Sequence, residues 1–121
     1  MNDVPGATSS SGVVVHLNDS DPAKHAAVLR NVSNLIDALE PETKIELVVH
    51  GPAISLLLPG SPHSETVRAL QHRGLAVDAC QNTLRGEHIL PDRLIPDTVV
   101  VPSGIAHLVI RQREGWAYLH P

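Results

Sequence analysis

Short apolar runs alternate with longer amphipathic segments along most of this chain. Five runs, rich in valine, leucine and isoleucine, have the length and composition of strands buried in a sheet. They cover residues 13–17, 44–50, 75–80, 98–101 and 116–119. Apolar residues recur at helical spacing between the first two runs, so the pattern predicts strands separated by helices.

Capping residues give the expected helix boundaries. Serine or aspartate side chains cap a helix N-terminus, proline fits the first helical position, and glycine suits the residue after the last turn. On these signals we expect helices that begin at Asp21-Pro22 and Ser61-Pro62, a short one that opens at Asn82, and one that begins at Ser103. The last should bury an apolar stripe of Ile105, Leu108 and Val109.

The alternation of strands and helices predicts the fold class. It indicates a three-layer α/β/α domain with a mainly parallel five-stranded sheet over residues 12–121, preceded by a flexible tail at 1–11. The order of the strands stays open. In such folds, sites form beyond the carboxyl ends of the strands. The candidate residues at those ends are Asn18, Asp19, His50, Gly51, Cys80, Asn82, Thr83, Ser103 and Gly104.

Composition excludes several classes of function. The chain has 121 residues, a net charge of −4, one tryptophan, one tyrosine and no phenylalanine, so it lacks the basic and aromatic surface that binds nucleic acid. No apolar run reaches the 18 or more residues of a membrane span. The first residues have no basic start and no apolar core, so we expect no signal peptide. A single cysteine cannot form an internal disulfide, and we expect a cytoplasmic protein.

One apolar run has no polar face to turn outward. Residues 53–58 are almost entirely aliphatic and lie between Pro52 and Pro59. Because exposed apolar patches usually mark contact surfaces, this run predicts a homo-oligomer.

Cys80 is the candidate nucleophile, because it falls between the end of a strand and the start of a helix. Backbone N–H groups and the helix dipole at such a junction favour the thiolate. The alternative is an inert packing cysteine, and the acidic neighbour Asp78 favours that alternative. The dipole alone is too weak to ionise the thiol at neutral pH, so activation needs further donors, such as the N–H groups of Asn82 and Thr83 or a protonated His50.

The remaining polar residues match no motif of metal or phosphate binding. None of the eight histidines forms a ligand pair, so we expect neither a metal nor another cofactor. His16 and His50 lie near strand ends and are either polar neighbours of a site or hydrogen-bonded, partly buried side chains. The segment Ser103-Gly104 either binds an anion through backbone N–H groups or is an ordinary helix cap.

Several segments together resemble the DsrE/DsrF-like (YchN-like) family, and the likeness covers residues 12–121. The segment Cys80-Gln-Asn-Thr-Leu followed by Val-Pro-Ser-Gly104 is the most specific part. The other segments are 13–19, 34–36, 48–51 and 115–118. The likeness is closest to a branch of members encoded as single genes.

The resemblance implies an α/β fold that assembles as trimers and hexamers. In the sulfur-relay members of the family, a cysteine after the third strand carries sulfur as a persulfide, and Cys80 matches that position. The expected function is therefore sulfur transfer through Cys80, with a sulfur donor or acceptor protein as partner. The relay proteins differ at residues 81–84 and work as complexes of different subunits. The alternative is an oligomeric module that binds a small ligand or anion, with Cys80 as a structural residue.

Overall fold

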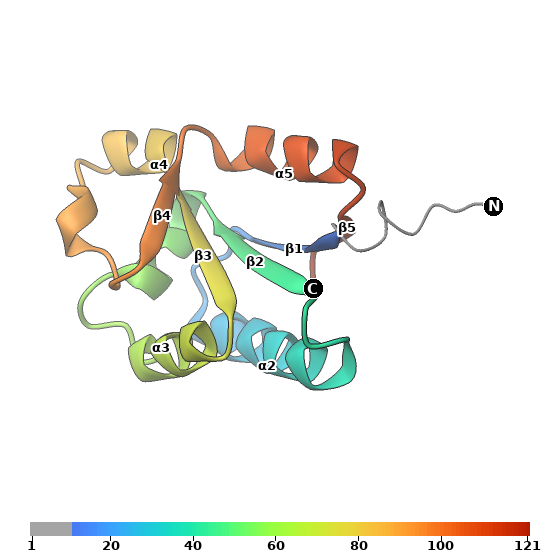
Figure 1. The fold of residues 1–121 in the computed structure, drawn as a ribbon. Coiled ribbons are helices and arrows are strands. Elements are labelled where there is room, and N and C mark those ends of the chain that lie inside the picture. Colours follow the sequence, from blue (N-terminus) through green and yellow to red (C-terminus); the bar gives the residue numbers. More distant parts are fainter. Residues whose placement is uncertain (1–10) are drawn as a thin grey trace.

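The core of the fold is a sheet of five parallel strands in the order β4-β3-β2-β1-β5 (Figure 1). The computed structural model describes residues 11–121, so the expected tail lies outside the described residues except for Ser11. The strands are β1 (Gly12–Leu17), β2 (Lys44–Val49), β3 (Leu75–Cys80), β4 (Thr98–Val101) and β5 (Ala117–Leu119). The helices are α2 (Pro22–Ala38), η1 (Gly51–Leu57), α3 (Ser64–His72), α4 (Gln81–Gly86), η2 (Pro91–Arg93) and α5 (Gly104–Arg113).

Local signals in the sequence explain most boundaries. The Asp21 side chain accepts a hydrogen bond from the Ala23 N–H and caps α2. Gly74 and Gly115, which follow α3 and α5, have φ values of 107° and 91°, a conformation that favours glycine. The start of α3 differs from the prediction. The Ser61 side chain accepts from the His63 N–H, and this local turn delays the helix until Ser64.

The sheet lies between two helical layers, as the alternating pattern predicted (Figure 1). Helices α2 and α3 cover one face, where most of the aliphatic core lies. Helix α5 lies over the opposite face, against a small cluster of Val14, Val48, Leu108 and Trp116. None of the helices in residues 11–121 has the length and apolar character needed to cross a bilayer.

The apolar run at 53–58 is buried within this chain. It forms most of the 3₁₀ helix η1, and Ala53, Leu56 and Leu57 are completely buried in the core. The sequence reason given for an oligomer is therefore wrong, because the apolar side chains of the run pack into the chain's own core. Ser55 is the exposed residue of the run, and its hydroxyl donates to the Pro52 carbonyl.

Helix α5 buries a different face from the predicted one. Of the expected stripe, only Leu108 is buried, whereas Ile105 and Val109 are 53% and 42% exposed. The sheet beneath α5 carries the buried carboxyl groups of Glu46 and Asp78. A polar side of the helix therefore turns inward to pair with them, and the apolar side faces outward.

Candidate functional site

Cys80 ends β3 and is the N-terminal capping residue of α4. It is 6% exposed, on the sheet face that α5 covers. Its neighbour Asn82 is exposed, so the sulfur lies just under the surface at the carboxyl edge of the sheet. This is the position at which the sequence placed the candidate nucleophile.

Several hydrogen-bond donors converge on the Cys80 sulfur. Burial by itself raises the pKa of the thiol, but hydrogen bonds from the Gly104 N–H, the Thr83 side chain and the N–H groups of Thr83 and Asn82 lower it below its ordinary value of 9.0. The sequence predicted the donors at Asn82 and Thr83. It did not predict that Gly104, from a distant helix, also donates.

The Thr83 hydroxyl is oriented toward the sulfur by a second contact. Its oxygen accepts a 2.8 Å hydrogen bond from the Gly51 N–H. Because a hydroxyl has one proton to donate, this acceptor contact leaves that proton for Cys80. Gly51 has a φ of 59°, so the turn that presents its N–H suits glycine. The predicted residues Gly51, Thr83 and Cys80 therefore form one continuous chain of hydrogen bonds.

Gly104 allows α5 to approach the sulfur closely. A β-carbon at Gly104 would lie 3.1 Å from the His50 β-carbon and 3.3 Å from the Cys80 β-carbon, which is tighter than ordinary packing. The preceding residue, Ser103, caps α5 by accepting from the Ala106 N–H at 3.2 Å. The sequence left open whether Ser103-Gly104 is a helix cap or an anion-binding segment. Ser103 is a helix cap. The neighbouring Gly104 N–H donates to the thiol sulfur of Cys80.

A chain of aromatic groups lies beside this region. The Nε2 atoms of His16 and His50 are 2.5 Å apart, and His16 Nδ1 is 2.7 Å from the Tyr118 hydroxyl. The His16 ring also stacks on His120, with ring centroids 4.3 Å apart. Sequence reasoning found His16 and His50 from their strand ends but missed Tyr118 and His120, because only the pairing of β5 with β1 brings these two residues there.

His16 and His50 are neutral at physiological pH. Burial, followed by the nearby His120 and His50, lowers the pKa of His16 to about 4. Burial and His120 also lower the pKa of His50. The expected protonated His50 is therefore wrong as a source of thiolate stabilisation, since a lowered pKa removes its charge at neutral pH.

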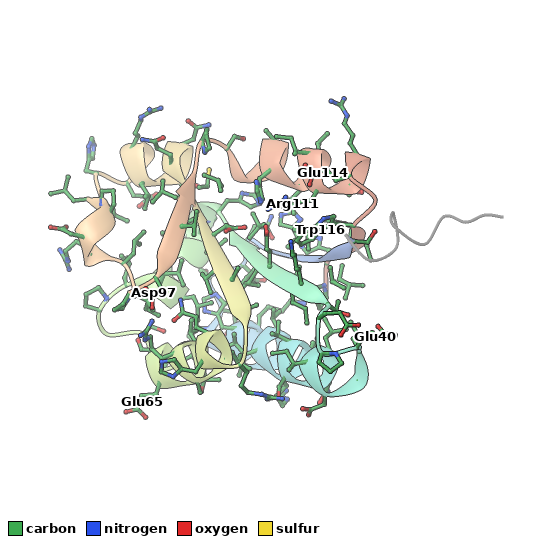
Figure 2. The ribbon with its side chains drawn as sticks, viewed as in Figure 1. Glu40, Glu65, Asp97, Arg111, Glu114 and Trp116 are labelled. Carbon is green, nitrogen blue, oxygen red and sulfur yellow. The ribbon has the colours of Figure 1, made fainter. Side chains whose placement is uncertain are left out.

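A second polar group lies under α5, on the same sheet face as Cys80. His107 Nε2 donates to Glu46 Oε1 at 2.7 Å and lies 3.3 Å from Asp78 Oδ2. Arg111 contacts both Glu46 oxygens, with its Nη2 2.6 Å from Oε2 and its Nε 3.2 Å from Oε1. The Arg111 guanidinium also lies 4.4 Å from the Trp116 ring centroid, in the layer between α5 and the sheet (Figure 2).

The two carboxyl groups share one proton. Burial and the hydrogen bond to Glu46 raise the pKa of Asp78 to about 8. Burial alone would raise the pKa of Glu46, but hydrogen bonds with Asp78, Arg111 and His107 lower it to about 2. Asp78 therefore holds the proton at neutral pH. The expectation that Asp78 opposes the thiolate as an acidic neighbour is wrong, because this carboxyl group is uncharged there.

Glu46, Asp78 and His107 also have the donor types of a metal site, with ligand atoms within 4.8 Å of one another. The linear sequence did not indicate this grouping, since the three residues lie on three different elements. Asp78 Oδ2 is buried without a hydrogen-bond partner. However, Arg111 already binds both oxygens of Glu46, and a cation would have to displace it. The contacts therefore fit an ion-pair network with one retained proton better than a metal centre.

Two predicted site residues do not join the Cys80 group. Asn18 and Asp19 are exposed in the turn after β1. Asp19 Oδ1 accepts from the Asp21 N–H at 2.8 Å, and its carbonyl oxygen is 2.5 Å from His25 Nε2. These contacts shape the entry into α2, which is the capping role that its short polar side chain suits.

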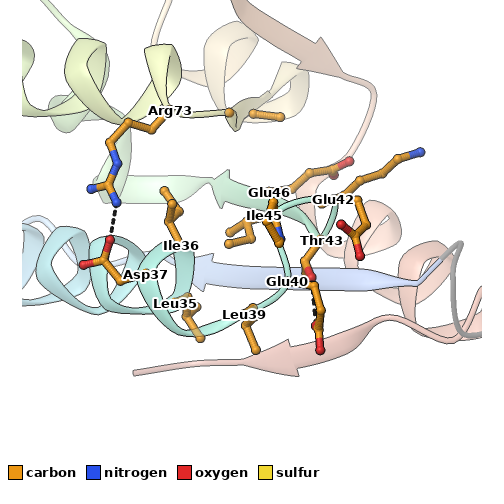
Figure 3. A pocket seen from close by; sticks show the side chains of 14 residues that line it. Leu35, Ile36, Asp37, Leu39, Glu40, Glu42, Thr43, Ile45, Glu46 and Arg73 are labelled. Carbon is orange, nitrogen blue, oxygen red and sulfur yellow. Dashed lines mark hydrogen bonds and ion pairs between the residues drawn. The ribbon is translucent and has the colours of Figure 1, made fainter.

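A cavity of about 570 Å³ opens at the other end of the sheet, beside the start of β2 (Figure 3). Leu35, Ile36 and Leu39 supply its apolar wall, and Arg73 pairs with Asp37 at its rim. Glu40 and Thr43 join across another part of the wall at 3.4 Å. The cavity lies at the amino ends of the strands, away from Cys80, and brings together none of the predicted site residues.

Comparison with solved structures gives two informative matches. MTH1491 from Methanobacterium thermoautotrophicum, described as a protein of unknown function, superposes with a TM-score of 0.88 at 37% identity, over 93% of this chain and all of that one. This chain belongs to the DsrE/DsrF-like (YchN-like) family. The YchN protein from E. coli has the same fold, with a TM-score of 0.73 at 13% identity, over 92% of this chain and 99% of that one. No family model and no curated protein matches the chain.

The YchN-like fold confirms the resemblance inferred from the sequence motifs. It also confirms the α/β class, and the sheet is parallel throughout. The identity of 37% with MTH1491 over almost the whole chain makes the relationship one of family as well as of fold.

Proposed function

We propose that this YchN-like protein carries sulfur as a persulfide on Cys80. The observation that supports the proposal is the set of donors around the sulfur, which lowers the thiol pKa although the side chain is buried. A structural cysteine needs no such donors, whereas a sulfur carrier needs its thiol in the thiolate form. Since the thiol must stay reduced, the proposal places the protein in the cytoplasm.

The transfer needs no redox partner. The Cys80 thiolate attacks the outer sulfur of a donor persulfide, R–S–SH, so that a new S–S bond forms at Cys80 and the donor S–S bond breaks. The products are the Cys80 persulfide and R–S⁻, which takes a proton from solvent. In the second step an acceptor thiolate attacks the outer sulfur, and Cys80 leaves as a thiolate that the same donors stabilise.

Mass spectrometry of the intact protein tests the proposal. We expect the protein, incubated with glutathione persulfide, to gain one sulfur atom, and a thiol acceptor to remove it. Cys80→Ser should gain none. If wild-type protein stays unmodified while a small free thiol is converted in the same mixture, Cys80 does not act as a carrier, and the ligand-binding module becomes the better account.

Thr83 gives a finer test of how the thiol is activated. In Thr83→Val the side-chain donor is lost at nearly constant volume, so the pKa of Cys80 should rise by about one unit, which corresponds to ~1.4 kcal/mol. The pH profile of iodoacetamide alkylation measures this shift. Thr66→Val, on the exposed side of α3, is the matched control and should leave the profile unchanged.

We also propose that the protein assembles with itself through the outer side of α5. Ile105, Val109 and Ile110 are each more than 40% exposed there, and Val99 of β4 is 52% exposed. Sedimentation is expected to show a trimer or hexamer, and the double change Ile105→Lys with Val109→Lys should reduce it to a folded monomer. A wild-type monomer of 13.0 kDa at micromolar concentration would contradict this assembly.

A further inference from the structure

We propose that Glu46 is a positioning residue for Cys80: its contacts with His107 and Arg111 hold α5 where the Gly104 N–H reaches the sulfur. The predicted effect on the pKa of the Cys80 thiol follows from the structure alone. Its consequence for sulfur transfer rests on the function proposed above.

Two neighbouring sets of contacts join α5 to the sheet, one at Gly104 and the next at His107. At the carboxyl edge, Gly104 of α5 contacts Cys80 of β3. Asp78 lies two residues earlier on the same face of β3, and it meets His107, which is one helical turn after Gly104. Because 104 and 107 share a side of the helix, a shift or rotation of α5 at His107 also moves the Gly104 N–H.

Glu46 extends the attachment by one more turn of the helix. It binds His107 and Arg111 from β2 through three contacts of 3.2 Å or less. The rest of this interface is small, since Leu108 is the buried apolar residue of α5 and packs on Val14, Val48 and Trp116. With so little apolar contact, the polar contacts determine how α5 lies on the sheet.

The position of Gly104 leaves little tolerance for movement. Its hypothetical β-carbon would be 3.1 to 3.4 Å from side-chain carbons of His50, Cys80 and Val48, so α5 lies so close to the sheet that any side chain larger than that of glycine would be crowded here. Hydrogen bonds to sulfur weaken with distance and misalignment. A small displacement of α5 is therefore enough to lose this donor.

Substitution of Glu46 in an Asp78→Asn background separates positioning from simple charge effects. Asp78 then cannot ionise when the Glu46 charge is removed, so the two effects predict opposite signs. Removing a negative charge near a thiol should lower the thiol pKa by direct electrostatics. Loss of the Gly104 donor should raise it. For Glu46→Gln we expect the pKa of Cys80, measured by the pH profile of iodoacetamide alkylation, to rise by about one unit, a tenfold fall in the thiolate-to-thiol ratio.

Three further variants complete the experiment. Glu46→Asp keeps the charge but shortens the side chain, so it should also raise the pKa, and it decides the result if Glu46→Gln does not fold. Asp78→Asn imitates the protonated acid and should preserve the wild-type value. Glu114→Gln removes an exposed carboxylate from the same arginine, whose Nη1 lies 2.8 Å from it, and should have no effect.

The NMR signal of the Gly104 amide gives a direct readout of the contact. In wild-type protein its chemical shift should follow the titration of Cys80, and this response should disappear in both Glu46 variants. A pKa that falls or stays constant in both variants would overturn the inference. Because alkylation uses no sulfur donor, a raised pKa together with absent persulfide formation would support the positioning role and contradict the proposed carrier function.

Discussion

Replacement of Leu57 by aspartate is expected to unfold the isolated chain. Leu57 is completely buried in the main core, and its carbonyl accepts a 3.0 Å hydrogen bond from the Ile95 N–H. Truncation of a buried leucine costs about 2–5 kcal/mol, and a buried carboxylate without a partner adds to that cost. The total is comparable to the whole stability of a typical domain, about 5–15 kcal/mol.

Circular dichroism and thermal unfolding measure this effect. Leu90→Asp is the matched control, because Leu90 is 68% exposed and its substitution should change the stability by less than about 0.5 kcal/mol. A folded, monomeric Leu57→Asp protein would contradict the structure and restore the interpretation of residues 53–58 as a contact surface.

The stability of the protein should fall as pH rises from about 6.5 to 8. The folded state keeps the Asp78 proton up to a pKa of about 8, whereas the unfolded chain releases it near 3.8. A folded-state pKa above the unfolded value stabilises the protein at low pH, and that contribution is lost as pH rises through the folded value. Because the folded and unfolded states differ by one bound proton, the free energy of unfolding falls by ~1.4 kcal/mol per pH unit, which amounts to about 2 kcal/mol across this window.

Other groups limit the window in which this slope is visible. His16 has a lowered pKa of about 4, so its neutral form stabilises the fold increasingly as pH rises to the ordinary value of 6.5. His50 acts in the same direction. Below pH 6.5, both histidines therefore oppose the loss of stability that Asp78 causes as pH rises. The contribution of Glu46 is complete above its ordinary value of 4.5 and is lost only as pH falls toward about 2.

Chemical denaturation at several pH values tests this prediction. Cys80 has a lowered pKa and so gains stability with rising pH, which opposes Asp78. The comparison is therefore made in a Cys80→Ser background, with and without Asp78→Asn. Asparagine cannot lose the proton, so the slope between pH 6.5 and 8 should be absent in that variant. Equal slopes in both proteins would show that Asp78 is already ionised.

The position of the thiol could be predicted from the sequence because it depends on local signals. The apolar run at 75–79 predicts a strand, and Asn82, Thr83 and Leu84 predict a helix directly after it. Cys80 therefore had to lie at their junction. The N–H donors of Asn82 and Thr83 follow from that junction, since the first N–H groups of any helix lack partners within it.

The buried polar group under α5 could not be predicted in the same way. Ile105, Leu108 and Val109 give α5 an apolar stripe, and the natural expectation is that this stripe faces the core. The sheet beneath it carries the buried carboxyl groups of Glu46 and Asp78, and leaving these groups without polar partners would cost more free energy than exposing the apolar stripe. Which side of a helix turns inward depends on the surface it meets, and that surface comes from other elements.

The sequence by itself determined the succession of strands and helices, the parallel α/β class and the place of Cys80 at a strand end, because spacing, caps and glycines act within a few residues. Only the tertiary structure decided the strand order β4-β3-β2-β1-β5, the burial of 53–58 and the meeting of Gly104 with Cys80. These features join residues far apart in the chain. They depend on how the layers pack, and side-chain periodicity in one segment carries no information about the segment that lies across from it.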